Sequence, residues 1–204
     1  TGEAGRVEIV ATDPNTVLDE TDAIMIVFRD GKYHYRYAME ALRRNKPVWV
    51  DKPLAIDPQE ALTLVREAKK RGIPLSGGSC CKWTSDVIAL RDKVRSGEVK
   101  PITAMLNFPV MLNSEYSGIH FYASHLVEMT AEIFGYAIRK VYAHRKGDGV
   151  TAVFEYDDKN VVLSFVNSSR YSCYIIEADK NTVFEIDTSS GLAALGIHDF
   201  MQAI

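Results

Sequence analysis

Short apolar runs alternate with segments of helical periodicity between residues 21 and 97, and this alternation constrains the fold more than any other feature. Residues 23–28 form a continuous apolar run, which is typical of a strand covered on both faces. A turn signal follows, and residues 33–45 then mix apolar and charged side chains at helical spacing. A strand followed by a helix and another strand predicts βαβ units and a parallel sheet, so this half is predicted to be α/β.

The alternation continues through two further strands, predicted over 47–50 and 73–76, and a helix predicted over 85–96. Between the two strands, Asp57 and Pro58 predict a helix start, because aspartate caps a helix and proline has the backbone dihedral of the first helical residue. The inward-facing residues of this helix, which is predicted to end at Gly72, are Ala61, Leu62, Leu64, Val65 and Ala68.

From residue 101 onward, β-branched and aromatic residues accumulate and turn signals separate neighbouring runs. One helix is predicted over 120–134, where apolar residues recur at helical spacing before a glycine ends it. The rest of this half is predicted to be mostly antiparallel sheet. A soft boundary near residue 100 divides the chain into domains 1–100 and 101–204. The strands are predicted over residues 102–110, 138–144, 150–156, 161–166, 173–178 and 182–186.

The composition is that of an ordinary globular protein, with 47% hydrophobic and 25% charged residues among 204. The 24 Lys and Arg residues against 27 Asp and Glu give a formal charge of −3, which does not support a nucleic-acid partner. No apolar run approaches the roughly 18 residues needed to cross a bilayer, so no membrane partner is expected. The cysteines Cys80, Cys81 and Cys173 form neither a disulfide framework nor a CxxC metal pair. They fit a reducing compartment, so the protein is expected to be cytoplasmic.

The most informative stretch is Asp51-Lys52-Pro53, which follows a predicted buried strand. Open α/β sheets bind ligands at the carboxyl ends of their strands, and Pro53 restricts the turn there. A lysine in this place can donate hydrogen bonds to a substrate hydroxyl or carbonyl and stabilise charge that develops on the oxygen. The alternative is that Asp51 and Lys52 form only a solvated turn, because strand ends are commonly charged.

Two histidines, His120 and His125, lie in the helix predicted over 120–134. Imidazole titrates near neutrality, so it can take or return a proton during oxidation and reduction of an alcohol, and His125 is the better candidate for this base. Glu128 shares a helix face with His125 and can orient its ring. The alternative is that both histidines are satisfied core or surface residues. No third ligand accompanies His and Glu here, so no metal site is predicted.

Two glycine-containing segments also bear on the site. Residues 147–152 match the GxGxxA dinucleotide fingerprint, but a strand rather than a helix is predicted to follow, so a hairpin is the better interpretation. Residues 77–83 follow another strand and either line a pocket or form a plain strand-to-helix loop. No partner base is indicated for the cysteines Cys80 and Cys81 in this loop.

The order of elements over nearly the whole chain resembles the glucose-fructose oxidoreductase, inositol dehydrogenase and MocA (Gfo/Idh/MocA) family of NAD(P)-dependent oxidoreductases. Asp51-Lys52-Pro53 carries the most specific match, because it is similar to the family's Glu-Lys-Pro motif. His34 matches the end of the family's Thr-Pro-Asn-x-x-His loop, whose position here begins at Arg29. The helix with His125 resembles the segment that supplies the family's catalytic histidine.

The resemblance implies a fold of two parts. The first is a truncated Rossmann-type parallel sheet. The second is an α+β part with an open-faced antiparallel sheet, through which family members often associate, so a homo-oligomer is expected.

The resemblance also implies roles for individual residues. Lys52 and His125 form the expected catalytic pair, and the Lys-Pro peptide of the family is often cis. The cofactor is expected to be NAD or NADP. The residues expected at the cofactor are Arg29, Asp51 and Lys52. The residues expected at the substrate are His120, Lys82 and Trp83.

Three departures from the family pattern bear on activity. Phe121 stands where the family often has an aspartate, four residues before the catalytic histidine. The glycine fingerprint that the family has before residue 1 is absent from the chain, and residues 198–204 resemble the start of a family helix cut short. The chain is therefore expected to be an inactive fragment of a longer polypeptide, because it lacks a phosphate cradle.

For the full-length protein, the resemblance implies hydride transfer between NAD(P) and a hydroxyl carbon of a sugar, cyclitol or related polyol. In this reaction, Lys52 polarises the oxygen and His125 exchanges the proton. One alternative is a non-catalytic sugar-binding or assembly protein, in which Phe121 and the loop with Cys80 and Cys81 mark decay of the site. Another is an NAD-using glycosidase of the same family, which would release a glycosyl leaving group.

Overall fold

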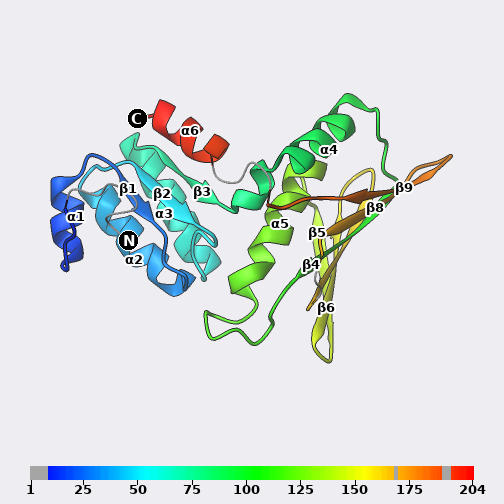
Figure 1. Cartoon of the computed structure of the whole chain (residues 1–204), viewed down its shortest axis with the longest axis horizontal. Helices are drawn as coiled ribbons and strands as arrows, with labels where there is room; N and C mark the ends of the chain where they lie inside the picture. The colour runs from blue at the N-terminus through cyan, green and yellow to red at the C-terminus, as the bar shows by residue number, and fades with distance from the viewer. Residues whose placement is uncertain (1–8, 168–169, 190–193) are drawn as a thin grey trace.

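The computed structural model describes residues 9–167, 170–189 and 194–204. Two sheets dominate it, a small parallel sheet at one end and a larger mixed sheet at the other (Figure 1). No helix in these described ranges is long and apolar enough to cross a membrane.

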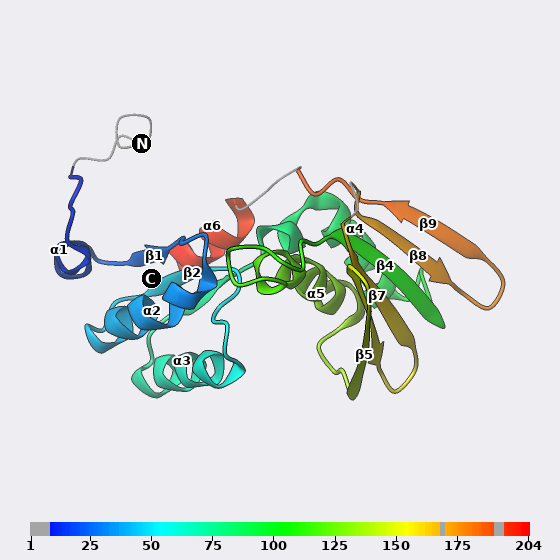
Figure 2. The same cartoon turned by 90° about the horizontal axis from the view of Figure 1, so that it is seen from below.

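The small sheet and its helices follow the predicted alternation. Their bounds are α1 (Pro14–Glu20), β1 (Ile24–Ile26), the 3-10 turn η1 (Gly31–Tyr33), α2 (His34–Arg43), β2 (Val48–Asp51), α3 (Pro58–Arg71), β3 (Leu75–Gly78) and α6 (Ala194–Gln202). The strand order is β1-β2-β3, and both neighbouring pairs are parallel. Figure 2 shows α2 and α3 on one side of the sheet and α6 on the other. Val48, Trp49 and Val50 of β2 are therefore buried on both faces. The prediction of a strand covered on both faces is wrong for residues 23–28, because Met25 in β1 is 49% exposed.

The apolar stripe of α3 is narrower than the sequence predicts. Leu64 and Ala68 are buried in the core of the small sheet, whereas Leu62 and Val65 are 45% and 48% exposed. Helix α3 packs against α2 along one line, so side chains beside that line face solvent. The end of the helix agrees with the prediction, because Gly72 closes it in the left-handed conformation at a φ of 67°.

All the strands expected after residue 101 are present in one six-stranded sheet of order β5-β6-β7-β4-β8-β9. The bounds in this half and before it are η2 (Cys80–Trp83), α4 (Ser85–Ser96), β4 (Thr103–Pro109), α5 (His120–Phe134), β5 (Lys140–Lys146), β6 (Gly149–Glu155), β7 (Asn160–Val166), β8 (Ser172–Ile176) and β9 (Asn181–Glu185). The match to a dinucleotide fingerprint falls on the β5–β6 hairpin, where Gly147 has a φ of 57°. The hairpin interpretation is thus confirmed.

The larger sheet is mostly antiparallel, as the sequence predicts, but one parallel pair of strands makes it mixed. Strand β4 pairs parallel with β7, and the other neighbouring pairs are antiparallel. Turn signals in a sequence report only on strands that are adjacent along the chain. Because helix α5 and the β5–β6 hairpin separate β4 from β7, their direction relative to each other could not be predicted from such signals.

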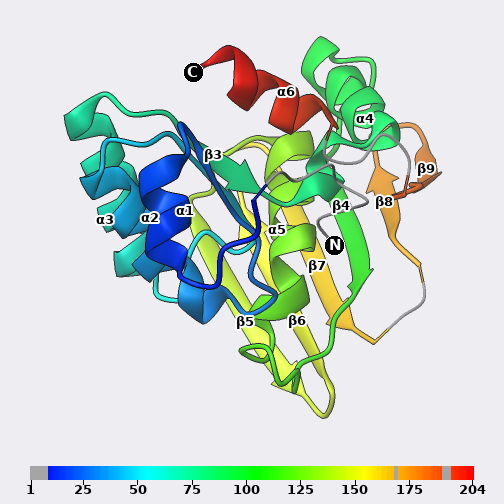
Figure 3. The same cartoon turned by 60° about the vertical axis from the view of Figure 1, so that its left-hand side comes forward.

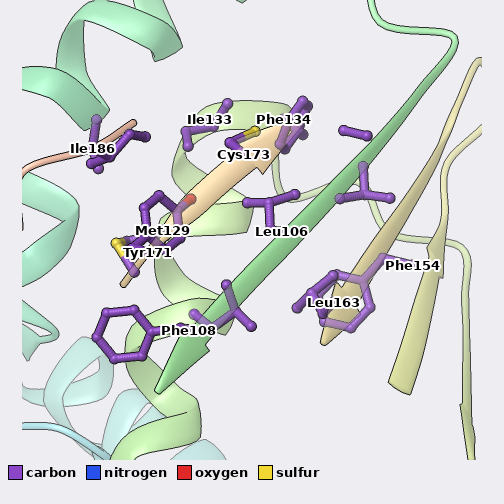
Figure 4. Packing of buried hydrophobic residues seen from close by; sticks show 14 of the residues in the cluster. Leu106, Phe108, Met129, Ile133, Phe134, Phe154, Leu163, Tyr171, Cys173 and Ile186 are labelled. Atoms are coloured by element: carbon purple, nitrogen blue, oxygen red, sulfur yellow. The ribbon is translucent and has the colours of Figure 1, made fainter. Parts of the chain in front are cut away.

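One face of the larger sheet forms the main core. Helix α5 lies across this face, with α4 beside it (Figure 3). In the close view, Met129 and Ile133 of α5 lie over Leu106 of β4 and Leu163 of β7, and all four side chains are at most 2% exposed (Figure 4). The packing presses α5 against the sheet and so places the start of that helix between the two sheets.

Candidate active site

The Lys52 side chain extends from the end of β2 to the start of α5. Its ammonium group donates a hydrogen bond to the carbonyl oxygen of Phe121 at 2.6 Å. The Lys52 nitrogen also lies 4.4 Å from the centre of the Phe121 ring and 5.1 Å from the centre of the Tyr122 ring. Lys52 is 8% exposed, so the alternative of a solvated turn is wrong for this side chain. Burial lowers the pKa of Lys52, although the carboxylate of Asp51 opposes the shift.

His125 lies one turn further along α5 and is 7% exposed. Its ring centre is 5.3 Å from that of Tyr122 and 5.5 Å from that of Phe108. Burial, and to a lesser extent the charge of Lys52, lowers the pKa of His125 to about 3, so the ring is neutral near pH 7. Lys52 and His125 thus border the same Tyr122 ring. The structure brings the two residues of the expected pair together.

The expected contact between Glu128 and His125 is replaced by another arrangement. The Nδ1 atom of His125 lies 2.7 Å from the hydroxyl oxygen of Ser79. The Glu128 carboxylate instead accepts hydrogen bonds from the Lys82 ammonium at 2.8 Å and from the Ser79 backbone N–H at 2.9 Å. The charged ammonium is a stronger partner for a carboxylate than a neutral ring, so Glu128 turns towards the loop before α4.

Lys82 and Trp83 lie together in η2. The Lys82 ammonium donates to Glu128 and to the carbonyl oxygen of Gly77 at 3.0 Å, and it lies 5.4 Å from the Trp83 ring centre. The Trp83 ring packs so closely on α6 that a Cβ atom at Gly196 would lie 2.6 Å from its indole nitrogen. Lys82 is therefore engaged in holding the loop against α5, and Trp83 in holding α6.

The remaining residues expected at the site lie at strand and helix ends. Arg29 is exposed after β1, and its guanidinium lies 5.3 Å from the ring centre of Tyr116. Asp51 is half-buried at the end of β2, where it pairs with Gly78 of β3. His120 is exposed at the first position of α5. These groups surround the region between the sheets without joining the Lys52 and His125 cluster in a hydrogen bond among the described residues.

Two residues that position the pair are not among the residues expected at the catalytic, cofactor or substrate positions. Ser79 is fully buried and contacts His125, and only its place in a loop after a strand could have suggested it. His34 is also fully buried, and its two ring nitrogens lie 2.6 Å from the carbonyl oxygen of Pro53 and 2.8 Å from that of Phe28. His34 thereby ties the end of β1 to the turn after Lys52, whose peptide bond to Pro53 is cis.

The residues at the strand ends fit the nicotinamide end of a dinucleotide. The carboxyl ends of three parallel strands meet there, and Lys52 uses one of its three N–H groups on Phe121. No glycine-rich loop between a strand and a helix, of the kind that cradles a pyrophosphate, occurs in the described ranges. The same ranges hold no group of three or more His, Cys, Asp or Glu side chains that could hold a metal ion.

The fold thus joins a Rossmann-type parallel sheet to a larger open-faced sheet, with the buried Lys52 and His125 between them. Residues 3–79 match the GFO_IDH_MocA family, described as an oxidoreductase family with an NAD-binding Rossmann fold. This match agrees with the resemblance in the sequence, and the NAD-binding fold that describes the family agrees with the expected NAD or NADP.

The chain is also similar to individual known proteins. The chain is 24% identical over 132 residues to scyllo-inositol 2-dehydrogenase (NADP(+)) IolW of Bacillus subtilis (strain 168), a match that covers 57% of this chain and 36% of the relative. A probable dehydrogenase from Thermotoga maritima shares the fold with a TM-score of 0.79 at 17% identity, over 90% of this chain and 64% of that one. GenD2 from gentamicin A biosynthesis, solved with NAD, has a TM-score of 0.76 at 16% identity, over 90% of this chain and 60% of that one. The chain thus spans about a third of its curated relative.

Proposed function

We propose that this chain is part of an NAD(P)-dependent oxidoreductase that transfers a hydride to or from a hydroxyl carbon of a sugar, cyclitol or related polyol. The observation that carries the proposal is the buried pair of Lys52 and His125 around the Tyr122 ring, at the carboxyl ends of the parallel strands. A nicotinamide cofactor, when bound, accepts or supplies the hydride. A cyclitol or sugar substrate is supported by the similarity to an inositol dehydrogenase.

Lys52 and His125 have different roles at the substrate oxygen in this proposal. The Lys52 ammonium donates a hydrogen bond to that oxygen and stabilises the negative charge that develops on it. His125 exchanges the proton, since the imidazole is neutral near pH 7 and has the lone pair that a base needs. Arg29 and Asp51, at the ends of β1 and β2, are proposed to contact the cofactor together with Lys52.

The substrate contacts are proposed to come from residues near the start of α5 and from η2. His120 is exposed at the helix start and can reach a bound hydroxyl group. Lys82 and Trp83 are proposed to shape the other side of the site, where Glu128 restricts the motion of Lys82 through a charged pair. We also retain the division near residue 100 into a Rossmann-type part and a substrate part, noting that α4 packs in the core of the larger sheet.

The first test is a titration of this chain, and of the full-length protein, with NAD(H) and NADP(H) followed by tryptophan fluorescence. We expect the full-length protein to bind one of the two cofactors and to reduce it with a polyol from a substrate screen. We expect the chain alone to be inactive. If neither protein binds a nicotinamide cofactor, the oxidoreductase proposal is wrong.

One observation favours a non-catalytic relative as the second candidate. The Phe121 ring lies 4.4 Å from the Lys52 nitrogen, so an apolar group packs on the ammonium. A protein with this arrangement could bind a sugar or join an assembly without oxidising it. Sugar binding by the full-length protein, without any bound nicotinamide cofactor, would favour this candidate.

We further propose that copies of the protein associate through the open face of the larger sheet. On this face, one row of apolar side chains runs through all six strands in register. The row consists of Tyr142, Val153, Val162, Met105, Tyr174 and Val183. Met105, Tyr142 and Val183 are between 52% and 61% exposed, which is unusual for a contiguous apolar surface of a monomer.

Replacing Met105 by lysine is expected to convert the oligomer to a monomer. Met105 lies in the middle of the row, so a charge there would be desolvated in any interface that covers the sheet. Light scattering coupled to size exclusion measures the mass. The control is Leu62→Lys on the exposed side of α3, which is expected to keep the wild-type mass. A wild-type monomer at tens of micromolar, or an unchanged mass for Met105→Lys, would rule out this interface.

We also propose that the protein works in a reducing compartment such as the cytoplasm. The three cysteines Cys80, Cys81 and Cys173 are all free thiols in the structure. Two of them are buried, and neighbouring Cys80 and Cys81 are not joined to each other. This agrees with the cysteine pattern of the sequence.

A further inference from the structure

The residue that contacts His125 most closely, Ser79, is held in place from three directions. It is fully buried at the end of the loop that leads from β3 into η2. Its backbone N–H donates to the Glu128 carboxylate at 2.9 Å, and its hydroxyl oxygen accepts from the Cys81 backbone N–H at 3.2 Å. The hydroxyl oxygen also lies 2.7 Å from Nδ1 of His125. The side chain therefore has one position and one orientation of its lone pairs.

The direction of the hydrogen bond between Ser79 and His125 follows from the hydrogens that each group can donate. A serine hydroxyl has one hydrogen to donate, and here its oxygen already accepts one from Cys81. Among the described residues, Nδ1 of His125 is the acceptor within reach of that hydrogen. If Nδ1 carried the ring hydrogen, the buried hydroxyl hydrogen would have no partner there, which costs free energy. The hydroxyl of Ser79 therefore donates to Nδ1, and the neutral ring carries its hydrogen on Nε2.

We propose that Ser79 is a positioning residue for His125, which holds the ring with its hydrogen on Nε2 and directs that N–H group at the substrate oxygen. This inference rests on the proposed function, because it gives His125 a substrate. Before substrate binds, both Lys52 and His125 offer hydrogen-bond donors to the site. Two donors suit a carbonyl oxygen, so the resting site is arranged to bind the oxidised substrate.

Oxidation of an alcohol then needs a change of tautomer before the proton moves, in which Nε2 gives its proton to water and Nδ1 takes a proton from water. With the ring hydrogen on Nδ1, the Ser79 oxygen accepts from it, because a hydroxyl oxygen accepts hydrogen bonds as well as donating one. The alcohol O–H bond breaks, its proton bonds to Nε2, and the ring becomes a cation whose Nδ1–H donates to Ser79. A bound oxidised nicotinamide would accept the hydride from the carbon that carries this oxygen. Ser79 thus serves both directions, whereas a carboxylate at this place would favour only the second tautomer.

The test is nuclear magnetic resonance of the histidine ring nitrogens in ¹⁵N-labelled protein at pH 7, where two-bond correlations show which nitrogen carries hydrogen. The His125 signals are identified by their loss in His125→Gln. We expect the hydrogen on Nε2 and an Nδ1 signal displaced by an accepted hydrogen bond. A hydrogen on Nδ1 in the wild-type protein would overturn the proposal, and this measurement needs no variant of Ser79.

Two variants separate the hydrogen bond from general packing. Ser79→Ala is expected to move the Nδ1 chemical shift to the value of an imidazole nitrogen that accepts no hydrogen bond. It is also expected to lower kcat of the full-length protein by about 10- to 100-fold with little change in KM. The matched control is Ser124→Ala, which removes a buried hydroxyl that lacks a partner among the described residues, beside His125 on the same helix. We expect Ser124→Ala to leave the Nδ1 signal unchanged.

The outcomes distinguish this inference from the proposed function. An Nδ1 signal that is the same in Ser79→Ala as in the wild-type protein would overturn the role of Ser79. The expected spectra in a full-length protein that binds no nicotinamide cofactor would support the hydrogen bond and overturn the proposed function instead. Equal displacement of the Nδ1 signal by both serine variants would show a packing effect and also overturn the proposal.

Discussion

Replacing Lys52 by methionine is expected to lower kcat of the full-length protein by about 10²- to 10³-fold, the loss typical of removing one donor to a developing oxygen charge. Methionine is unbranched and only one atom shorter than lysine, and it suits the site because Lys52 is 8% exposed and packs on two aromatic rings. The variant should therefore fold, and its loss should be in the chemical step. Steady-state kinetics with the polyol found in the substrate screen measures the change.

The control for this experiment is Lys46→Met, six residues before Lys52 in the sequence. Lys46 donates a long hydrogen bond of 3.5 Å to the carbonyl oxygen of Asp19, away from the pair. Its replacement is expected to leave kcat within about twofold of the wild-type value, since exposed charges contribute little. Cofactor titrations of both variants report whether binding survives. Equal kcat for Lys52→Met and the wild-type protein would show that Lys52 does not stabilise charge on the substrate oxygen.

Replacing Gly77 by alanine is expected to lower the free energy of unfolding by about 4 kcal/mol, from strain and overpacking together. Gly77 has a φ of 137°, which residues other than glycine rarely adopt. A Cβ atom there would lie 1.8 Å from the carbonyl oxygen of Val50, its partner in the parallel pairing of β2 and β3. The backbone of Val50 cannot move without separating these strands. Urea unfolding followed by circular dichroism measures the loss.

Gly72 provides the matched control for this substitution. It also has a positive φ, of 67°, but no atom lies within 4 Å of the position of its Cβ. Gly72→Ala is therefore expected to cost only about 1–2 kcal/mol, which is the cost of the left-handed conformation without a clash. Equal losses for the two variants would contradict the close approach at Gly77. The clash also bears on the site, because Gly77 precedes the loop that carries Ser79 to His125.

Much of the fold follows from patterns that act within a few residues. Helices α4 and α5 begin and end at the predicted residues, because their ends are marked by local signals such as Gly97 and Gly135. Lys52 was singled out for a similar reason, since a charge after a buried apolar run marks a strand end. Such features need only the chemistry of neighbouring residues along the chain.

The contacts that make the site depend on residues far apart in the sequence. Ser79 and His125 are 46 positions apart, and Ser79 and Glu128 are 49 apart. Helical spacing correctly placed Glu128 near His125, but the loop of η2 supplies stronger partners for its carboxylate. No local pattern indicates that this loop packs on α5, so the partner of His125 could not be predicted.

Local propensity and periodicity in the sequence therefore determine where most helices and strands form, and they indicate Lys52 and His125 as candidate site residues. Packing of the two sheets around α5 decides which side chains meet and the parallel pairing of β4 with β7. Packing of α3 against α2 decides the exposure of Leu62 and Val65. The physical reason is that a strand edge, a helix face or a carboxylate has several possible partners. Burial of the whole apolar surface selects among them, and that selection is a property of the assembled molecule.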